Sequence, residues 1–135
     1  MKIVVEARVK APLAAVWKAW TTPTDIVQWN AASADWHTTA ATVDLRPGGT
    51  FSSRMEARDG SMGFDFAGEY TRVEEPALIE ARFGDRTLSV TFTPGPDSVL
   101  VREEFDAESE HPIEMQRAGW QAILDNFKRH VEARG

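Results

Sequence analysis

Residues 112–133 read PIEMQRAGWQAILDNFKRHVEA and form the one long helix that the sequence predicts. Their apolar side chains recur at steps of three, four and seven, which is typical of one face of a helix with 3.6 residues per turn. Pro112 suits the start of a helix, and Gly135 follows its end. Such a helix needs a broad apolar surface to lie on. Its own apolar residues are Ile113, Trp120, Ile123, Leu124, Phe127 and Val131.

Two residues interrupt this apolar face. Gln116 places a polar amide between Ile113 and Trp120, and Gly119 leaves a position beside them without a side chain. Glycine inside a helix destabilises it by about 1 kcal/mol relative to alanine, so its presence calls for an explanation. We interpret the two residues as a sign of a cavity between this helix and the surface that it covers.

The composition indicates one domain, residues 1–135, with a core of ordinary size. Hydrophobic residues make up 42% of the chain, and five of them are tryptophans. A chain of this length buries roughly two-thirds of its unfolded surface when it folds. Cysteine is absent, which excludes disulfides, a thiol nucleophile and thiolate metal sites.

The charge distribution argues against polyanionic partners. The formal net charge is −6, and the 15 lysines and arginines are scattered singly or in pairs. Nucleic acid and anionic membrane surfaces both require a basic patch, so we expect neither as a partner. No apolar run approaches the roughly 18 residues of a membrane span, and Glu6 follows too early for a signal peptide. We therefore expect a cytoplasmic protein.

The chain begins with a strand and two short helices. Residues 2–10 alternate between apolar and charged side chains, as in a half-buried strand. One short helix is expected from Pro12 and a second from Pro23. Thr22 is the expected cap of the second helix, with Asp25 as its partner in a capping box.

From Trp36 onward the apolar pattern has a period of two and is broken by turn sequences. Arg46-Pro47-Gly48-Gly49 favours a type II turn, and Asp59-Gly60 favours a tight hairpin. With residues 2–10, the alternating segments predict seven strands, the last six at 36–45, 50–58, 62–74, 79–83, 88–92 and 99–105.

An antiparallel sheet with one apolar face needs a cover, and the C-terminal helix is the only long candidate. The sequence therefore predicts an α+β fold. A curved seven-stranded antiparallel sheet wraps around the long C-terminal helix, and two short helices follow the first strand.

Several stretches carry a family resemblance. They are APLAAVWKAWTTPTDIVQW at residues 11–29, DLRPGGTF at 44–51, RMEARDGSMGFDFAGEYTRV at 54–73, EEFDAE at 103–108 and GWQAILDNFKRHVE at 119–132. The first resembles the opening of the START-like, or SRPBCC, superfamily. The others are similar to its branch named after the activator of heat-shock protein 90 ATPase, whose Asp-hydrophobic-Arg-x-Gly-Gly turn stands in DLRPGGTF. The resemblance covers essentially the whole chain and implies a helix-grip fold with a deep cavity between sheet and helix.

The resemblance implies several functions rather than one. Members of the superfamily include lipid and hormone carriers, polyketide cyclases and stress-inducible proteins, and no residue set defines a reaction across them. The eukaryotic activators carry a separate N-terminal domain that contacts the chaperone. This chain has no room for such a domain, so a chaperone partner is doubtful.

Alternation places three polar side chains, His37, Tyr70 and Glu103, on otherwise apolar strand faces. An ionised carboxylate on a dry face is costly, so the pKa of Glu103 should lie above its ordinary value unless His37 or an arginine pairs with it. His37 could also be solvated near its strand start, and Tyr70 could be a core residue with its hydroxyl at the rim. Glu103 and His37 are the candidates for a catalytic acid or base.

The tryptophans divide between the core and the expected pocket. Trp17 and Trp120 lie on regular helical faces and are predicted to pack in the core. Trp20, Trp29 and Trp36 cluster where the mouth of a cavity would lie, so pocket lining and ordinary packing are both open for them. The predicted ligand-binding residues are Trp20, Trp29, Trp36, His37, Phe51, Met55, Phe66, Tyr70, Phe92, Glu103, Gln116, Gly119 and Trp120.

Metal chemistry finds no support in the sequence. His37, His111 and His130 lie far apart, and none belongs to an HExxH or His-x-His spacing. We expect neither a metal nor a cofactor.

Three functions are left in order of preference. The first is non-enzymatic binding of a small, mostly apolar molecule in the cavity. The second is an enzyme of the polyketide cyclase or dehydratase type, with Glu103 or His37 as its general acid–base. The third is a module that interacts with a chaperone. Whether the chain is a monomer or a homodimer stays open.

Overall fold

The computed structural model describes residues 1–134, and Gly135, which was expected just past the last helix, lies outside them. Seven strands and three helices follow one another within the described residues in the expected order. The strands are β1 (Lys2–Val9), β2 (Trp36–Val43), β3 (Thr50–Ala57), β4 (Gly63–Glu74), β5 (Leu78–Phe83), β6 (Arg86–Pro94) and β7 (Val99–Asp106). The helices are α1 (Leu13–Thr21), α2 (Pro23–Trp29) and α3 (Ile113–Arg134).

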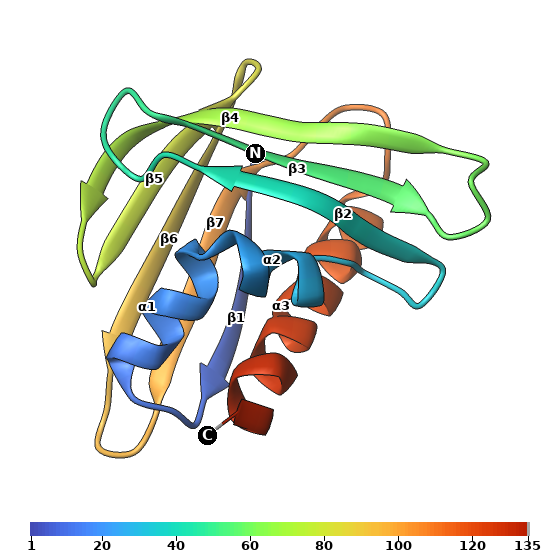
Figure 1. The fold of residues 1–135 in the computed structure, drawn as a ribbon. Helices are drawn as coiled ribbons and strands as arrows, with labels where there is room; N and C mark the ends of the chain where they lie inside the picture. The colour runs from blue at the N-terminus through green and yellow to red at the C-terminus, as the bar shows by residue number, and fades with distance from the viewer. Residues whose placement is uncertain (135) are drawn as a thin grey trace.

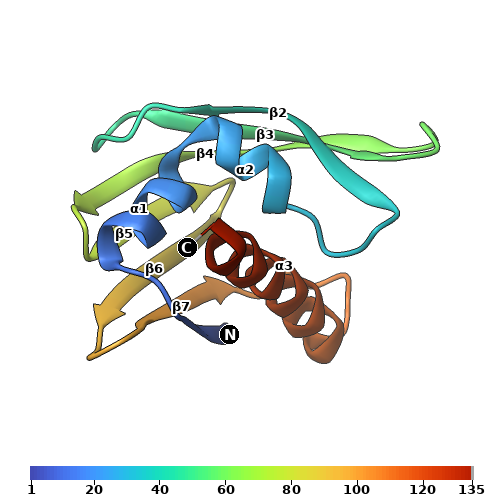
Figure 2. The same ribbon diagram turned by 60° about the horizontal axis from the view of Figure 1, so that its bottom comes forward.

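The strands form one antiparallel sheet in the order β1-β7-β6-β5-β4-β3-β2. Strands β2 to β7 are neighbours in chain order, and β1 pairs with β7 at the edge of the sheet. The sheet curves, and α3 lies on its concave side together with α1 and α2 (Figures 1 and 2). The predicted α+β helix-grip fold is confirmed.

The turn between β2 and β3 shows why the hairpins form where the sequence places them. Gly48 has φ +85°, a conformation that glycine adopts readily and L-residues with side chains rarely do. The amide of Gly49 donates a hydrogen bond to the carbonyl of Arg46 at 2.9 Å. A type II turn needs a positive φ at its third residue, so the expected turn is present.

A β-bulge in β2 reverses the predicted phase of one site residue. The pairing of β2 with β3 shifts register between Thr38 and Ala40, so one extra residue is accommodated there. On the N-terminal side of the bulge, Thr38 is buried and pairs with Met55, whereas His37 pairs with Glu56 on the outer face. The expectation that His37 shares the inner face with Ala41 was wrong, because a period of two does not survive an inserted residue.

The short helix α2 is tied to the end of α3 by a buried carboxylate. Asp25, only 4% exposed, accepts a hydrogen bond from Nε2 of His130 at 2.9 Å and also pairs with Arg134. The sequence predicted Asp25 as part of a capping box with Thr22, but Thr22 makes no side-chain cap hydrogen bond. The carboxylate therefore holds two helices together instead of capping one.

The C-terminal half of α3 forms the tightly packed part of the core. Leu124 and Phe127 are fully buried, and the ring of Phe127 lies 4.9 Å, centroid to centroid, from each of Trp20 and Trp29.

Among the described residues, no helix has both the length and the hydropathy needed to cross a membrane.

Candidate functional site

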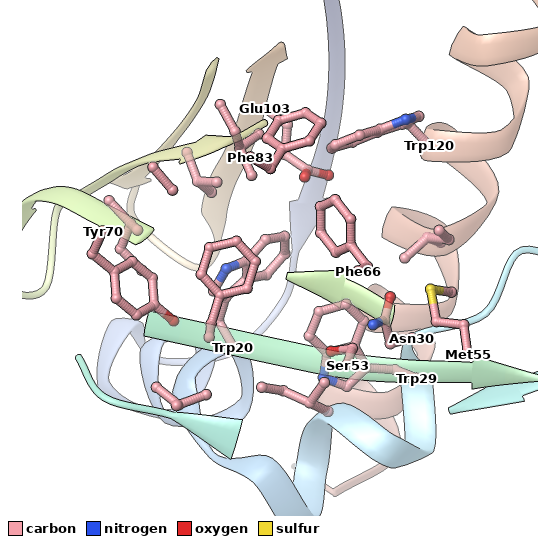
Figure 3. A pocket seen from close by; sticks show the side chains of 18 of the residues that line it. Trp20, Trp29, Asn30, Ser53, Met55, Phe66, Tyr70, Phe83, Glu103 and Trp120 are labelled. Carbon is pink, nitrogen blue, oxygen red and sulfur yellow. The ribbon is translucent and has the colours of Figure 1, made fainter. Parts of the chain in front are cut away.

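A pocket of about 320 Å³ lies between the concave face of the sheet and the helices α2 and α3. Its walls are mainly apolar and come from strands β2 to β7, from Trp20 at the end of α1, and from α2 and α3. Figure 3 shows the side chains that line it converging from the sheet and the helices. Phe64 belongs to the lining and is 48% exposed, which marks a side on which the pocket opens.

Eight of the predicted ligand-binding residues line this pocket. They are Trp20, Trp29, Phe51, Met55, Phe66, Tyr70, Glu103 and Trp120. The strand residues among them come from β3, β4 and β7, where alternation identified the inner face correctly. Trp29 is held in place because its indole nitrogen donates a hydrogen bond to the carbonyl of Ala19 at 3.1 Å.

Three predicted aromatic and imidazole side chains lie elsewhere. Phe92 is a core residue whose ring lies 5.3 Å from that of Trp17. Trp36 contacts Phe64, with ring centroids 5.9 Å apart, and lines a separate surface groove beside α3. His37 lies on the outer face of β2 because of the bulge, so it is not positioned for acid–base chemistry in the pocket.

Neither of the two residues that interrupt the apolar face of α3 lines the pocket. The amide of Gln116 donates hydrogen bonds to the carbonyls of Glu108 and His111 at 3.1 and 2.8 Å, and its oxygen accepts one from the amide of Glu108 at 2.9 Å. Gln116 therefore anchors the loop before α3. Gly119 does not line the pocket, and a Cβ added there would meet no atom within 4 Å.

Glu103 is the most unusual group in the pocket. It is 5% exposed, and its neighbours across the sheet are Val5 on β1 and Val90 on β6. No described residue offers it a hydrogen bond or an ion pair, and desolvation alone raises its pKa to about 8. No completely enclosed side-chain oxygen in the described residues lacks a partner, so the carboxyl keeps some contact with the pocket space.

Tyr70, Ser53 and Asn30 are further polar side chains of the pocket lining. Burial, with a smaller contribution from the charge of Asp44, raises the pKa of Tyr70 to about 12, so its phenol is un-ionised near neutral pH. Ser53 and Asn30 were not predicted. Ser53 could have been found, because it alternates in phase with Phe51 and Met55, whereas Asn30 lies just after α2, where no periodicity applies.

Arg86 is the only cationic side chain among the described residues of the lining. Its Nε donates a hydrogen bond to the carbonyl of Asp106 at 3.0 Å. Its guanidinium carbon lies 4.6 Å from the centroid of the Phe83 ring. The guanidinium of Arg86 thus already contacts a backbone carbonyl and an aromatic ring of the protein.

Aromatic rings from three elements line the same pocket as Glu103 (Figure 3). The rings of Phe66, Phe83 and Trp120, here called the three-ring cluster, have centroids 5.3, 6.1 and 6.2 Å apart. Trp120 also stacks on Phe105 at 3.8 Å with an angle of 12° between the planes. Trp120 was predicted both as core and as a ligand-binding residue, and it packs on Phe105 while lining the pocket.

Glu108, Glu110 and His111 are the one group of three potential metal ligands found in the part of the chain that the structure describes. They lie on the loop before α3, outside the pocket, and two of them are exposed. Nδ1 of His111 already lies 3.0 Å from each carboxylate oxygen of Glu108. We therefore interpret the contact between Glu108 and His111 as an ion pair within the loop.

Residues 10–132 match the family described as Activator of Hsp90 ATPase homolog 1-like protein. A solution structure of an AHSA1-like protein from Aeromonas hydrophila is 51% identical, with a TM-score of 0.94 over 100% of this chain and 94% of that chain. A protein from Cytophaga hutchinsonii, also solved in solution, is 46% identical, with a TM-score of 0.85 over 98% of this chain and 93% of that chain. A crystal structure of a protein from Nitrosomonas europaea shares the fold, with 17% identity and a TM-score of 0.87 over 100% and 96%. The comparison with curated proteins gave no match.

Proposed function

Since this chain belongs to the family of activator of Hsp90 ATPase homolog 1-like proteins, whose fold suits a ligand-binding domain, we propose that it binds a small, mostly apolar molecule in its pocket. The observation that carries the proposal is a pocket of about 320 Å³ with mainly apolar walls and a few polar side chains, among them Glu103. Pockets for small molecules usually have about 300–1,000 Å³, apolar walls and few polar groups. The volume favours a ligand at the small end of this range.

The positions of the polar side chains would determine how such a ligand is oriented in the pocket. In Figure 3 the Glu103 carboxyl points toward the rings of Phe66 and Trp120, whereas Ser53, Asn30 and Tyr70 lie on other walls of the pocket. A ligand with an apolar body and one polar end can satisfy Glu103 while its body contacts the aromatic walls.

The test uses N-phenyl-1-naphthylamine, an apolar dye that is uncharged near neutral pH. We expect saturable binding at one site, with energy transfer from the pocket tryptophans Trp20, Trp29 and Trp120 to the dye. Ser53→Phe should remove most of the binding, because Ser53 is 6% exposed and lines the pocket. Ser52→Phe is the matched control, since it introduces the same side chain one residue away, on the opposite face of β3.

Backbone NMR spectra would establish that both variants are folded. Equal dye affinity for the two variants, or no saturable binding to the wild-type protein, would contradict the proposed function.

One observation favours a second candidate, an acid–base enzyme of the cyclase or dehydratase type. A buried carboxyl with a pKa of about 8 can exchange a proton with a bound substrate near neutral pH. Exchange of the α-protons of 4-phenylbutan-2-one for deuterium in D₂O would then be faster with the wild-type protein than with Glu103→Gln. A chaperone partner stays the third hypothesis, and it rests on the family's description alone.

A further inference from the structure

We propose that the molecule bound in this pocket carries a basic nitrogen, whose cation lies against Glu103 and the three-ring cluster. This inference rests on the proposed function and narrows its ligand to lipophilic amines, either protonated or quaternary.

The first argument is the isolation of the Glu103 carboxyl. It is 5% exposed between Val5 and Val90, and no described residue donates a hydrogen bond to it. A carboxyl group kept without donors in an apolar surrounding lowers the stability of the fold. Figure 3 shows it pointing into the pocket toward the rings of Phe66 and Trp120. A ligand is therefore the natural source of the missing donor.

The second argument is the composition of the wall around this carboxyl. Phe66 from β4, Phe83 from β5 and Trp120 from α3 form a cluster of three aromatic rings that lines the same pocket as this carboxyl. Aromatic faces attract cations, and they do so more strongly where water is excluded. Arg86 already shows this attraction, because its guanidinium lies 4.6 Å from the centre of the Phe83 ring. A carboxylate beside aromatic rings favours an ammonium group over an anion or a simple hydrocarbon.

The third argument concerns the other charged and titratable groups of the pocket. The titratable side chains among the described pocket-lining residues are Glu103, Tyr70 and Arg86. The inner-face residues beside Glu103 on β1, β6 and β7 are apolar, namely Val5, Val90, Val101 and Phe105. Arg86 is held by Asp106 and Phe83, and a guanidinium keeps its charge at all relevant pH values. The net charge of −6 also attracts cations to the molecule.

The inference predicts a definite pH dependence. The pKa of Glu103 in the free protein is about 8, so its carboxyl must lose a proton when it pairs with a cation near neutral pH. The affinity for an amine should therefore rise about tenfold per pH unit below this pKa and level off above it. Tyr70, whose pKa is about 12, does not titrate in this range. An alkylamine stays protonated up to about pH 10.

The experiment compares 4-phenylbutylamine with 4-phenylbutan-1-ol, which has the same shape and no charge. Calorimetric titrations from pH 6 to pH 9 span the pKa of Glu103, about 8. At the upper end we expect the amine to bind at least about tenfold more tightly than the alcohol, and at the lower end, where the free carboxyl is protonated, proton release should be visible as a buffer-dependent heat. Glu103→Gln should remove this preference and the pH dependence. Glu104→Gln on the outer face is the matched control and should change neither.

An independent measurement does not depend on any variant. In wild-type protein with carbon-13-labelled glutamate, binding of the amine should move the pKa of Glu103 from about 8 to well below neutral. A carboxyl that stays protonated in the complex would overturn the proposal.

The remaining outcomes separate this inference from the proposed function. Equal affinity for amine and alcohol, with normal binding of the uncharged dye, would overturn the amine and leave the pocket function intact. Tighter binding of the alcohol than of the amine at low pH, retained in Glu103→Gln, would show that the protonated carboxyl donates a hydrogen bond to a neutral ligand, which also overturns the amine. No binding of the dye or of either probe would overturn the proposed function itself.

Discussion

The two halves of α3 carry the same apolar pattern but border different surroundings. In the C-terminal half, Leu124 and Phe127 are completely buried, and Phe127 packs against rings from α1 and α2. In the N-terminal half, Trp120 and Ile123 are half-buried and line the pocket. The comparison teaches that hydrophobic periodicity identifies the face of a helix that turns inward. It does not say whether protein or a ligand fills the space opposite that face.

The largest expected effect on stability comes from a substitution in the C-terminal half of α3. Phe127→Ala should lower the free energy of unfolding by about 3–5 kcal/mol, because a completely buried ring is replaced by a cavity. Urea denaturation followed by circular dichroism would measure the loss. A loss below about 1 kcal/mol would mean that this half of the helix is not packed as the structure shows.

The pH dependence of stability tests the pocket that the N-terminal half of α3 borders. Burial raises the folded-state pKa of Glu103 from an ordinary value of 4.5 to about 8, so between these values the unfolded state ionises while the folded state keeps its proton. Wild-type stability should therefore fall as pH rises through this window and then level off. Glu103→Gln lacks this loss and should be more stable than wild type near pH 8 by roughly 2–4 kcal/mol.

Denaturation curves of Glu103→Gln and Glu104→Gln at a series of pH values would measure this difference. If the wild-type protein and Glu103→Gln respond to pH identically, the carboxyl is not desolvated. A large loss of stability in Glu103→Gln would reveal a buried cationic partner.

Trp120→Ala should have a smaller effect than Phe127→Ala, even though tryptophan is the larger side chain. Trp120 loses its stacking on Phe105, but its other contacts border the pocket, which already holds empty space. We expect a loss of about 2–3 kcal/mol, together with a clear loss of dye affinity. A larger loss than in Phe127→Ala would reverse the comparison between the two halves.

Gly119→Ala should have the smallest effect and the opposite sign. A Cβ at this position meets no atom within 4 Å, so alanine should stabilise α3 by up to about 1 kcal/mol. Dye affinity should stay unchanged because Gly119 does not line the pocket. A thermal melt and a dye titration of the same variant would test both statements, and a weaker affinity would place the pocket nearer to this helix face.

Most of the fold could be predicted because its signals are local. Alternation, turn residues and helical periodicity each depend on neighbours in sequence, so the seven strands, the turn at Gly48 and the long helix were predicted correctly. The side on which Glu103 lies and the direction of its pKa shift also follow from alternation, since Val101 and Phe105 flank it in phase.

The predictions failed where one inserted residue changed the alternation of a strand, or where a polar side chain bound a nearby loop instead of facing the pocket. The bulge between Thr38 and Ala40 moved His37 to the outer face, and nothing in the alternating pattern marks an inserted residue. Gln116 was expected in a cavity and instead binds the backbone of Glu108 and His111, a choice between partners that depends on how the loop returns to the helix.

From its residues alone this chain specifies which side chains turn inward, because that depends on the periods of strand and helix. The existence of the pocket, its size and the approach of Phe66, Phe83 and Trp120 to Glu103 arise only when β4, β5, α3 and β7 come together. The physical reason is that the direction in which a side chain points depends on the local backbone conformation. The volume of a pocket depends on how closely several elements, far apart in sequence, pack against one another.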